Sequence, residues 1–226
     1  WDHAEMIERF RRAFVQTNPL SDFTLPLVSL VSGRKVGRLL RHEFGEVPIE
    51  DLPLPFFCVS SNLTSGRLAV HQHGSLWRWL RASLAIPGVL PPVFHGGEVF
   101  VDGGTMNNLP VDVMRAQGRG PVIGVDAGTD RAFTTNVEST EAPAVWNLFR
   151  SRRGRQRPNI LQILWRAGMV NSAAATAGQR GQTDLLLQPP LAEIDLLDWK
   201  SFERAIDIGY RHACERLAQD HGLPRA

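Results

Sequence analysis

One short segment of the sequence combines residue types that could perform acid–base chemistry. Residues 99–101 form an apolar run typical of a buried strand, and Asp102, Gly103 and Gly104 follow it directly. Chemistry in open α/β sheets gathers where strands end and turn into helices. Two glycines let the backbone turn tightly and let another group approach closely. We therefore predict that Asp102 is a catalytic carboxylate and that the Asp102-Gly103-Gly104 motif positions it.

A carboxylate in this position needs both burial and a nucleophile. A solvated aspartate, with a pKa of about 3.9, is a poor general base at neutral pH. Partial burial raises that pKa and lets the carboxylate accept the proton of a serine hydroxyl. The sequence contains no G-x-S-x-G, the elbow that exposes a nucleophilic serine on a strand-to-helix turn. Ser32, Ser65 and Ser75 fit turn or cap positions, so we expect the nucleophile upstream of Trp1.

Two weaker patterns suggest metal chemistry. His71 and His73 could place two imidazoles on one face of a strand, a spacing that metals use. No third ligand follows at a suggestive spacing, which favours two polar residues on a solvated strand edge. Asp126 ends an apolar run as Asp102 does, so an enzyme using both carboxylates with a metal stays an alternative. A turn or capping role is favoured for Asp126, and we expect neither a metal nor a cofactor.

The elements that would position Asp102 alternate between helix and strand. Hydrophobic periodicity and breakers predict helices over residues 2–15, 36–44, 75–86, 111–116, 160–177 and 199–219. Strands are predicted over residues 55–63, 68–71, 99–101, 122–126 and 184–187. Such alternation is typical of crossover units, which predicts an α/β fold with a mainly parallel central sheet. Residues 1–226 show no internal repeat and no convincing boundary, so a single domain is expected.

Composition sets further bounds. The 226 residues suffice for one α/β domain with a well-buried core. The net charge of +2 gives no nucleic-acid footprint, so no nucleic-acid partner is expected. Cys58 and Cys214 lie in predicted buried elements and do not make a disulfide framework, which favours a reducing compartment. No apolar run approaches the ~18 residues of a membrane span.

Two basic segments suggest contact with a membrane surface. The first is the predicted helix with its preceding turn, residues 34–42, and the second is an arginine run in residues 150–157, read as a mobile surface loop. Each such charge contributes on the order of 1 kcal/mol near an acidic bilayer. A solvated surface without a partner is the other interpretation. The expected location is therefore cytoplasmic or peripherally membrane-associated.

Several segments together resemble a known family. They are RASLAIPGVLPP at residues 81–92, Val101-Asp102-Gly103-Gly104, and NNLPVD at residues 107–112. This set resembles the patatin-like phospholipase family, and most closely its neuropathy-target-esterase-like branch. The resemblance runs from about Asp22 onward and is most specific at residues 87–110.

The resemblance implies a fold and a reaction. The family fold is a three-layer α/β/α domain, of which this chain would be the C-terminal, N-terminally incomplete portion. The family hydrolyses acyl esters of phospholipids and lysophospholipids with a Ser–Asp dyad, and Asp102 would be its proton acceptor. Acyl chains would lie near a group of apolar residues, namely Leu84, Ile86, Val89, Leu90 and Phe94.

This sequence also departs from the family pattern. The family's glycine-rich oxyanion loop and G-x-S-x-G elbow precede the matching region, and both are missing here. The chain alone is therefore expected to be inactive. A non-catalytic interaction or regulatory fragment of the same fold remains the alternative.

Overall fold

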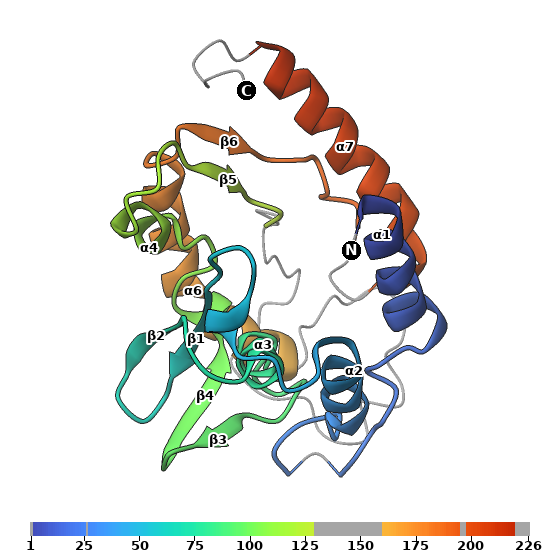
Figure 1. Cartoon of the computed structure of the whole chain (residues 1–226). Helices are drawn as coiled ribbons and strands as arrows, with labels where there is room; N and C mark the ends of the chain where they lie inside the picture. Colours follow the sequence, from blue (N-terminus) through green and yellow to red (C-terminus); the bar gives the residue numbers. More distant parts are fainter. Residues whose placement is uncertain (1, 26, 129–159, 195–197, 220–226) are drawn as a thin grey trace, which may run out of the picture.

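The computed structural model describes residues 2–25, 27–128, 160–194 and 198–219, and they form an α/β structure (Figure 1). The helices are α1 (His3–Phe10), α2 (Arg34–Phe44), α3 (Leu76–Ser83), α4 (Val111–Ala116), α6 (Ile160–Arg180) and α7 (Phe202–Gln219). A π-helical segment, η1 (Arg11–Gln16), extends α1, and the short 3-10 turns are η2 (Ile49–Asp51), η3 (Gly103–Thr105) and η4 (Trp199–Ser201). The strands are β1 (Cys58–Asn62), β2 (Arg67–His71), β3 (Val93–His95), β4 (Glu98–Asp102), β5 (Ile123–Val125) and β6 (Leu185–Leu187).

The larger sheet has the strand order β2-β1-β4-β3, and all three of its pairings are antiparallel. The α/β class is confirmed, but the prediction of a mainly parallel sheet does not hold for the described residues. Short connections explain the difference. Gly96-Gly97 joins β3 to β4 and a short turn ending at Gly66 joins β1 to β2, whereas a parallel pair needs a crossover of a dozen or more residues.

The only parallel pairing among the described strands joins β5 to β6. The predicted buried strand at residues 122–126 is therefore present, but it is not fully covered. Ile123 and Val125 are exposed and only Gly124 between them is buried. In this two-stranded sheet, the face of β5 that carries Ile123 and Val125 is not covered. The apolar run therefore predicted more burial than the strand has.

Helix α3 packs on the larger sheet through an aromatic cluster. Trp79 stacks on His71 of β2 at a ring-centroid distance of 3.8 Å and meets Phe100 of β4 edge-on at 5.4 Å. His71 is buried, and its Nε2 is hydrogen-bonded to Ser60 Oγ at 2.7 Å. The expectation of a solvated strand edge is therefore wrong for His71, because Trp79 covers it.

Helix α2 packs beside α3 over a small apolar core. The buried members are Val31, Val36, Leu40 and Leu90. Leu90, predicted to lie near acyl chains, is thus part of the core between these helices. The core explains why α2 carries its basic residues on the opposite, exposed side.

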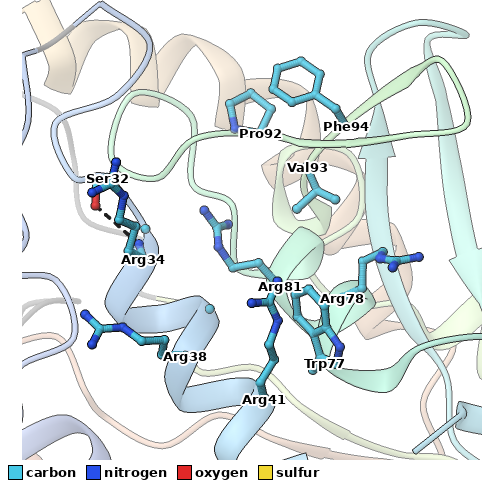
Figure 2. Close-up of a pocket in the computed structure, with 12 residues that line it drawn as sticks. Ser32, Arg34, Arg38, Arg41, Trp77, Arg78, Arg81, Pro92, Val93 and Phe94 are labelled. Atoms are coloured by element: carbon cyan, nitrogen blue, oxygen red, sulfur yellow. Dashed lines mark hydrogen bonds between the residues drawn. The ribbon is translucent and has the colours of Figure 1, made fainter. Parts of the chain in front are cut away.

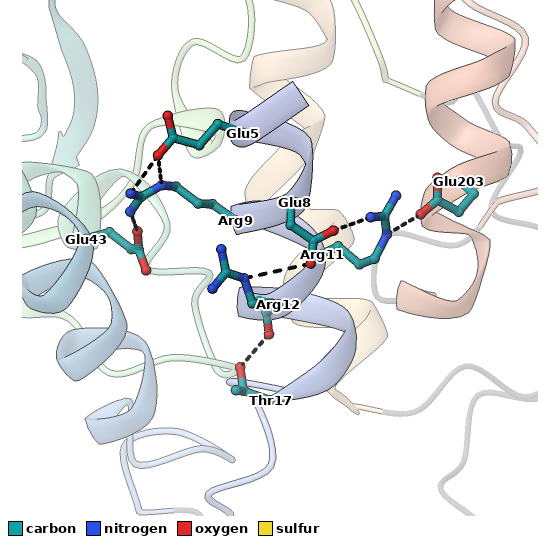
Figure 3. Close-up of polar contacts among 8 residues, drawn as sticks. All are labelled: Glu5, Glu8, Arg9, Arg11, Arg12, Thr17, Glu43 and Glu203. Carbon is teal, nitrogen blue, oxygen red and sulfur yellow. Dashed lines mark hydrogen bonds and ion pairs between the residues drawn. The ribbon is translucent and has the colours of Figure 1, made fainter. Parts of the chain in front are cut away.

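Ion pairs join α1 and its extension η1 to two other elements (Figure 3). Arg9 contacts Glu43 of α2 at 2.9 Å, and Arg11 contacts Glu203 of α7 at 2.6 Å. Phe14 also stacks on Trp199 at 5.0 Å between ring centroids. Segments from the two ends of the chain are therefore held side by side, as Figure 1 shows for α1 and α7.

Other expectations have mixed outcomes. Cys58 is buried as predicted, whereas Cys214 is exposed on α7. The arginine run at residues 150–157, with its predicted mobile loop, lies outside the described residues. No helix in the described part of the chain is long and apolar enough to cross a membrane.

The buried His71 predicts a pH-dependent stability. Burial, and then the nearby His95, lowers the pKa of His71 to about 4 from 6.5. Because the folded state resists protonation, stability is full above pH 6.5 and falls as pH drops toward 4, by on the order of 2 kcal/mol. We expect His71→Phe, which keeps a ring against Trp79, to remove this part of the decline. Urea denaturation across that range measures it.

The matched control is His73→Phe, which changes an exposed histidine two residues away. It should retain the wild-type decline. Equal pH slopes for wild type and His71→Phe would contradict the assignment.

Candidate active site

The backbone of Asp102 is held on both sides. Its N–H donates to the carbonyl of Ala85 at 3.0 Å, and its carbonyl accepts from Ser61 Oγ at 2.9 Å. Ser60 of β1 is its register partner across the sheet. Asp102 is therefore the last residue of β4, and the sheet fixes its position before the chain turns into η3.

The two glycines of the motif have separate steric roles. A Cβ on Gly103 would overlap the carbonyl oxygen of Val59 and lie 2.7 Å from Val59 Cγ2, so η3 presses directly on β1. A Cβ on Gly104 would lie 2.9 Å from Asp102 Oδ1 and 2.9 Å from Asn108 Oδ1. Neither glycine has a positive φ. Space, rather than backbone conformation, therefore requires glycine at both positions.

Two asparagines support the turn that follows Asp102. The Asn107 N–H donates to the carbonyl of Gly103 at 2.9 Å, and its side chain donates to Asp112 of α4 at 2.9 Å. Asn108 lies against Gly104 and reaches toward Gly128. The loop from β4 to α4 is thus bonded at both ends, which keeps the Asp102 carboxylate in one place.

The Asp102 carboxylate faces a cavity of about 470 Å³. Burial raises the pKa of Asp102 to about 6, and the hydrogen bond from the Gly104 N–H to Oδ1, at 2.6 Å, opposes part of that rise. The cavity wall beside it is apolar and includes Phe56, Phe57 and Met114. Low-dielectric surroundings of this kind tune a carboxylate toward general-base chemistry near neutral pH.

The cavity also contains two nucleophile-type side chains that the sequence patterns did not single out. Ser83 comes from the end of α3, and Cys58 from the start of β1. Burial raises the pKa of the Cys58 thiol to about 12, so it stays protonated and unreactive. Among the described contacts no hydrogen bond joins Ser83 to Asp102. No motif precedes Ser83 in the sequence; only the fold brings it to the cavity.

The serines weighed from the sequence lie elsewhere. Ser32 Oγ donates to Asp22 Oδ2 at 2.6 Å, the Ser65 N–H donates to Asn62 Oδ1 in a turn, and Ser75 is the N-cap residue of α3. None of the three lines the Asp102 cavity. Ser65 thus lies in a turn as predicted, and Ser75 occupies the predicted cap position, although its hydroxyl makes no capping hydrogen bond.

The structure does not bring the possible metal ligands together. Asp126 is buried and accepts from Arg180 Nε at 2.7 Å and from the Gly128 N–H at 2.9 Å, so it forms a turn and an ion pair. His71 lies in the aromatic cluster, whereas His73 is exposed. Within the described ranges there is no group of three or more side chains suited to a metal ion.

Comparison with known proteins identifies the family. A family profile for patatin-like phospholipases matches residues 2–115, a span that contains β4, the two glycines and most of α4. The chain belongs to the patatin-like phospholipase family. The resemblance noted in the sequence is thereby confirmed.

Named relatives place this patatin-like chain near one branch. It is 31% identical over 228 residues to an uncharacterised NTE family protein of Mycobacterium tuberculosis (strain ATCC 25618 / H37Rv), covering 99% of this chain and 39% of that protein. It is 33% identical over 215 residues to lysophospholipase NTE1 of Saccharomyces cerevisiae, covering 91% of this chain and 13% of that protein. The corresponding protein of Eremothecium gossypii is 32% identical over 216 residues, covering 91% and 14%. The chain spans well under half of each relative.

Because an added Cβ would meet different atoms at Gly103 and at Gly104, alanine substitution should affect stability differently at the two positions. Gly103→Ala pushes against the β1 backbone and should reduce the free energy of unfolding by roughly 1–3 kcal/mol. Gly104→Ala meets two side-chain oxygens that can shift, so it should cost less stability but displace the Asp102 carboxylate. Urea denaturation of both variants tests the order. A Gly104→Ala variant less stable than Gly103→Ala would contradict it.

The raised pKa of Asp102 predicts that the site is destabilised at neutral pH. The unfolded aspartate loses its proton near pH 4 and the folded one near pH 6, so stability falls as pH rises between these values. Asp102→Asn should therefore raise the free energy of unfolding above pH 6, by on the order of 2 kcal/mol, and raise it little at pH 4.

Asp184→Asn is the opposite control. Hydrogen bonds from the Val122 N–H and then Arg115 lower the pKa of the exposed Asp184, so its removal should not stabilise the protein at neutral pH. Denaturation at both pH values measures the two variants. An Asp102→Asn variant that is less stable than wild type at neutral pH would refute the interpretation.

Proposed function

We propose that this chain supplies the aspartate half of an esterase centre that hydrolyses acyl esters of phospholipids or lysophospholipids. The observation that carries the proposal is a buried Asp102 whose pKa is raised to about 6, at the edge of an apolar cavity. The chain would be the C-terminal portion of one patatin-like domain. Its nucleophile, a serine preceding this chain in the whole protein, would complete a Ser–Asp dyad.

The hydrogen bonds of the carboxylate indicate which oxygen acts as the base. Oδ1 accepts from the Gly104 N–H, while Oδ2 accepts no hydrogen bond from any described residue. Oδ2 is thus the oxygen that would receive the serine proton. The Gly104 N–H would hold the carboxyl plane so that this oxygen points to the nucleophile, and burial would keep competing water away.

The proposed reaction has two steps. The serine oxygen attacks the ester carbonyl while its proton passes to Asp102, and that proton then leaves with the alcohol, a lysophospholipid or its glycerol-phosphate remainder. Water next gives a proton to Asp102 and attacks the acyl-serine ester. The fatty acid is released, and Asp102 returns the proton to the leaving serine oxygen, which restores both residues.

The cavity wall suits an acyl chain. Phe56, Phe57, Met114, Pro55 and Pro110 line the cavity, and Asp102 is its one charged lining residue among those described. The volume of about 470 Å³ lies within the range of small-molecule sites. This differs from the sequence expectation, because none of the five residues proposed to contact acyl chains lines this cavity. The name lysophospholipase carried by the yeast relatives supports the substrate class.

The test is Asp102→Asn in the full-length protein, with hydrolysis of a lysophospholipid as the readout. Loss of the proton acceptor should lower kcat/KM by about two to four orders of magnitude. For the wild-type enzyme, kcat/KM should rise with pH and level off above a midpoint near 6, because Oδ2 must be deprotonated to act.

Ser83→Ala is the matched control. It removes the serine hydroxyl that lines the Asp102 cavity. If the nucleophile lies outside this chain, kcat/KM should stay within about threefold of wild type. A Ser83→Ala variant as inactive as Asp102→Asn would move the nucleophile into this chain. Full turnover by Asp102→Asn would end the dyad proposal, whereas absence of hydrolysis by the wild-type full-length protein would favour the non-catalytic interaction role.

A further inference from the structure

A second cavity, of about 500 Å³, lies between α2 and α3 and is bordered by β3 (Figure 2). Of the described residues that line it, none is acidic and five are arginines: Arg34, Arg38, Arg41, Arg78 and Arg81. The whole chain carries a net charge of only +2, so this concentration is not a result of composition. Like charges held together repel, and a concave basic surface attracts an anion.

Arg81 gives the most specific indication. Its side chain is buried, at 6% exposure, yet Nη1 has no hydrogen-bond partner and Nη2 donates to the carbonyl of Pro91 at 3.0 Å. Burial lowers the pKa of Arg81 to about 10, which leaves it charged at neutral pH. A buried cationic N–H without an acceptor is costly. An acceptor within the cavity would satisfy it.

Asp22 is the acid that acts on Arg81; one of its carboxylate oxygens is engaged elsewhere, and its buried Oδ1 has no hydrogen-bond partner among the described residues. Asp22 interacts electrostatically with Arg81, but its Oδ2 accepts from Ser32 Oγ at 2.6 Å and from the Lys35 N–H at 3.1 Å. No hydrogen bond to Asp22 from Arg81 occurs among the described contacts. Asp22 therefore lowers the local repulsion without satisfying Arg81 Nη1.

The start of α2 adds a second anomaly. Gly33 has a φ of +73°, and a Cβ there would lie 2.6 Å from Arg81 Nη2, so glycine lets the guanidinium reach the first turn. That turn carries Arg34 and Lys35 and no acidic residue. Cations are unfavourable at the positive end of a helix, whereas an anion there is favourable. The sequence of α2 thus suits a helix end that meets a negative ligand.

Trp77 organises two more of the arginines. The Arg41 guanidinium carbon lies 4.0 Å from the Trp77 ring centroid, and that of Arg78 lies 5.7 Å from it. Figure 2 shows Arg41 from α2 and Arg81 from α3 reaching into the same space beside Trp77. Stacking fixes these side chains before a ligand arrives, which reduces the entropy lost on binding.

We infer that this cavity binds a phosphate group. Phosphate has several charged acceptor oxygens, and guanidinium groups bind it through paired, charge-assisted hydrogen bonds. One anion beside Trp77 could accept from Arg81 Nη1 and from Arg41 of α2 at once. The site lies outside the Asp102 cavity and shares no lining residue with it.

The surroundings favour a phosphate carried by a membrane lipid. A loop ends at Ser32 on the cavity rim, closed by hydrogen bonds from Thr24 N–H to the Leu30 carbonyl and from Ser32 N–H to the Asp22 carbonyl. The exposed apolar residues of this loop are Phe23, Leu25, Leu27, Val28 and Leu30, and Phe94 of β3 is exposed as well. Apolar side chains beside a basic site suit the boundary between headgroups and acyl chains.

The experiment titrates the full-length protein with inorganic phosphate by calorimetry at constant ionic strength. A second arm measures co-sedimentation with phosphatidylcholine vesicles, with and without phosphatidic acid. We expect saturable phosphate binding and selective binding to the vesicles that contain phosphatidic acid. Phosphate binding without vesicle binding would also support the cavity, with a soluble phosphate compound as its ligand.

Arg34→Gln combined with Arg41→Gln removes two exposed arginines of the cavity and should weaken phosphate binding by at least about tenfold. Arg67→Gln combined with Arg119→Gln removes the same charge from exposed positions outside it and should change affinity by no more than about twofold. Both are surface changes, so neither depends on refolding around Arg81.

Two outcomes would overturn the inference. One is the absence of saturable phosphate binding by the wild-type protein, and the other is an equal loss in both double variants. Asp102→Asn should bind phosphate with wild-type affinity. Failure of the hydrolase proposal and failure of the phosphate cavity are therefore separate results.

Discussion

The site depends on one close approach, that of the η3 backbone to β1 at Gly103. No side chain fits between Gly103 and Val59, so the turn after β4 lies directly on the neighbouring strand. That contact fixes where the chain turns after β4, and so fixes the position of the Asp102 side chain. Gly104 then brings its N–H within 2.6 Å of Asp102 Oδ1. The two glycines therefore have separate roles. Gly103 lets the turn pack against β1, and Gly104 places its N–H where it orients the Asp102 carboxylate.

Burial in this part of the fold shifts the pKa values of two titratable groups in opposite directions. Burial makes Asp102 hold its proton to about pH 6 and makes His71 resist a proton down to about pH 4. Ser60 connects them, because it is the register partner of Asp102 and hydrogen-bonds His71. Between these pH values both groups are neutral in the folded protein, and their effects on stability oppose each other as pH changes. Charging Asp102 at neutral pH is thus a cost that the rest of the sheet must offset, as is common where a site is tuned for chemistry.

Local patterns in the sequence predicted most elements and the central residue. The 3.6-residue periodicity located α2, α4 and α7, and the apolar run before Asp102 located β4. Strand direction was not available from such patterns, because pairing depends on contacts between distant segments, and β1 and β4 proved antiparallel. The burial of His71 required Trp79 from the next helix, and the position of Ser83 required the fold to bring α3 beside β4. An exposed Cys214 shows the converse limit, since an apolar helical stripe does not reveal whether another element covers it.

The arginine cavity illustrates how a composition average conceals a site. Acidic residues elsewhere balance the chain to +2; the ion pairs of Arg9 with Glu43 and of Arg11 with Glu203 are two examples. The cavity arginines come from α2 and α3, whose basic residues are spaced as in many exposed helices. Only the packing of α2 against α3 over Val36, Leu40 and Leu90 brings Arg41 and Arg81 into the same space beside Trp77. The core that fixes the two helices therefore also fixes the positive electrostatic potential of the cavity between them. The buried Arg81 Nη1 without a hydrogen-bond partner distinguishes the proposed binding site from a solvated surface.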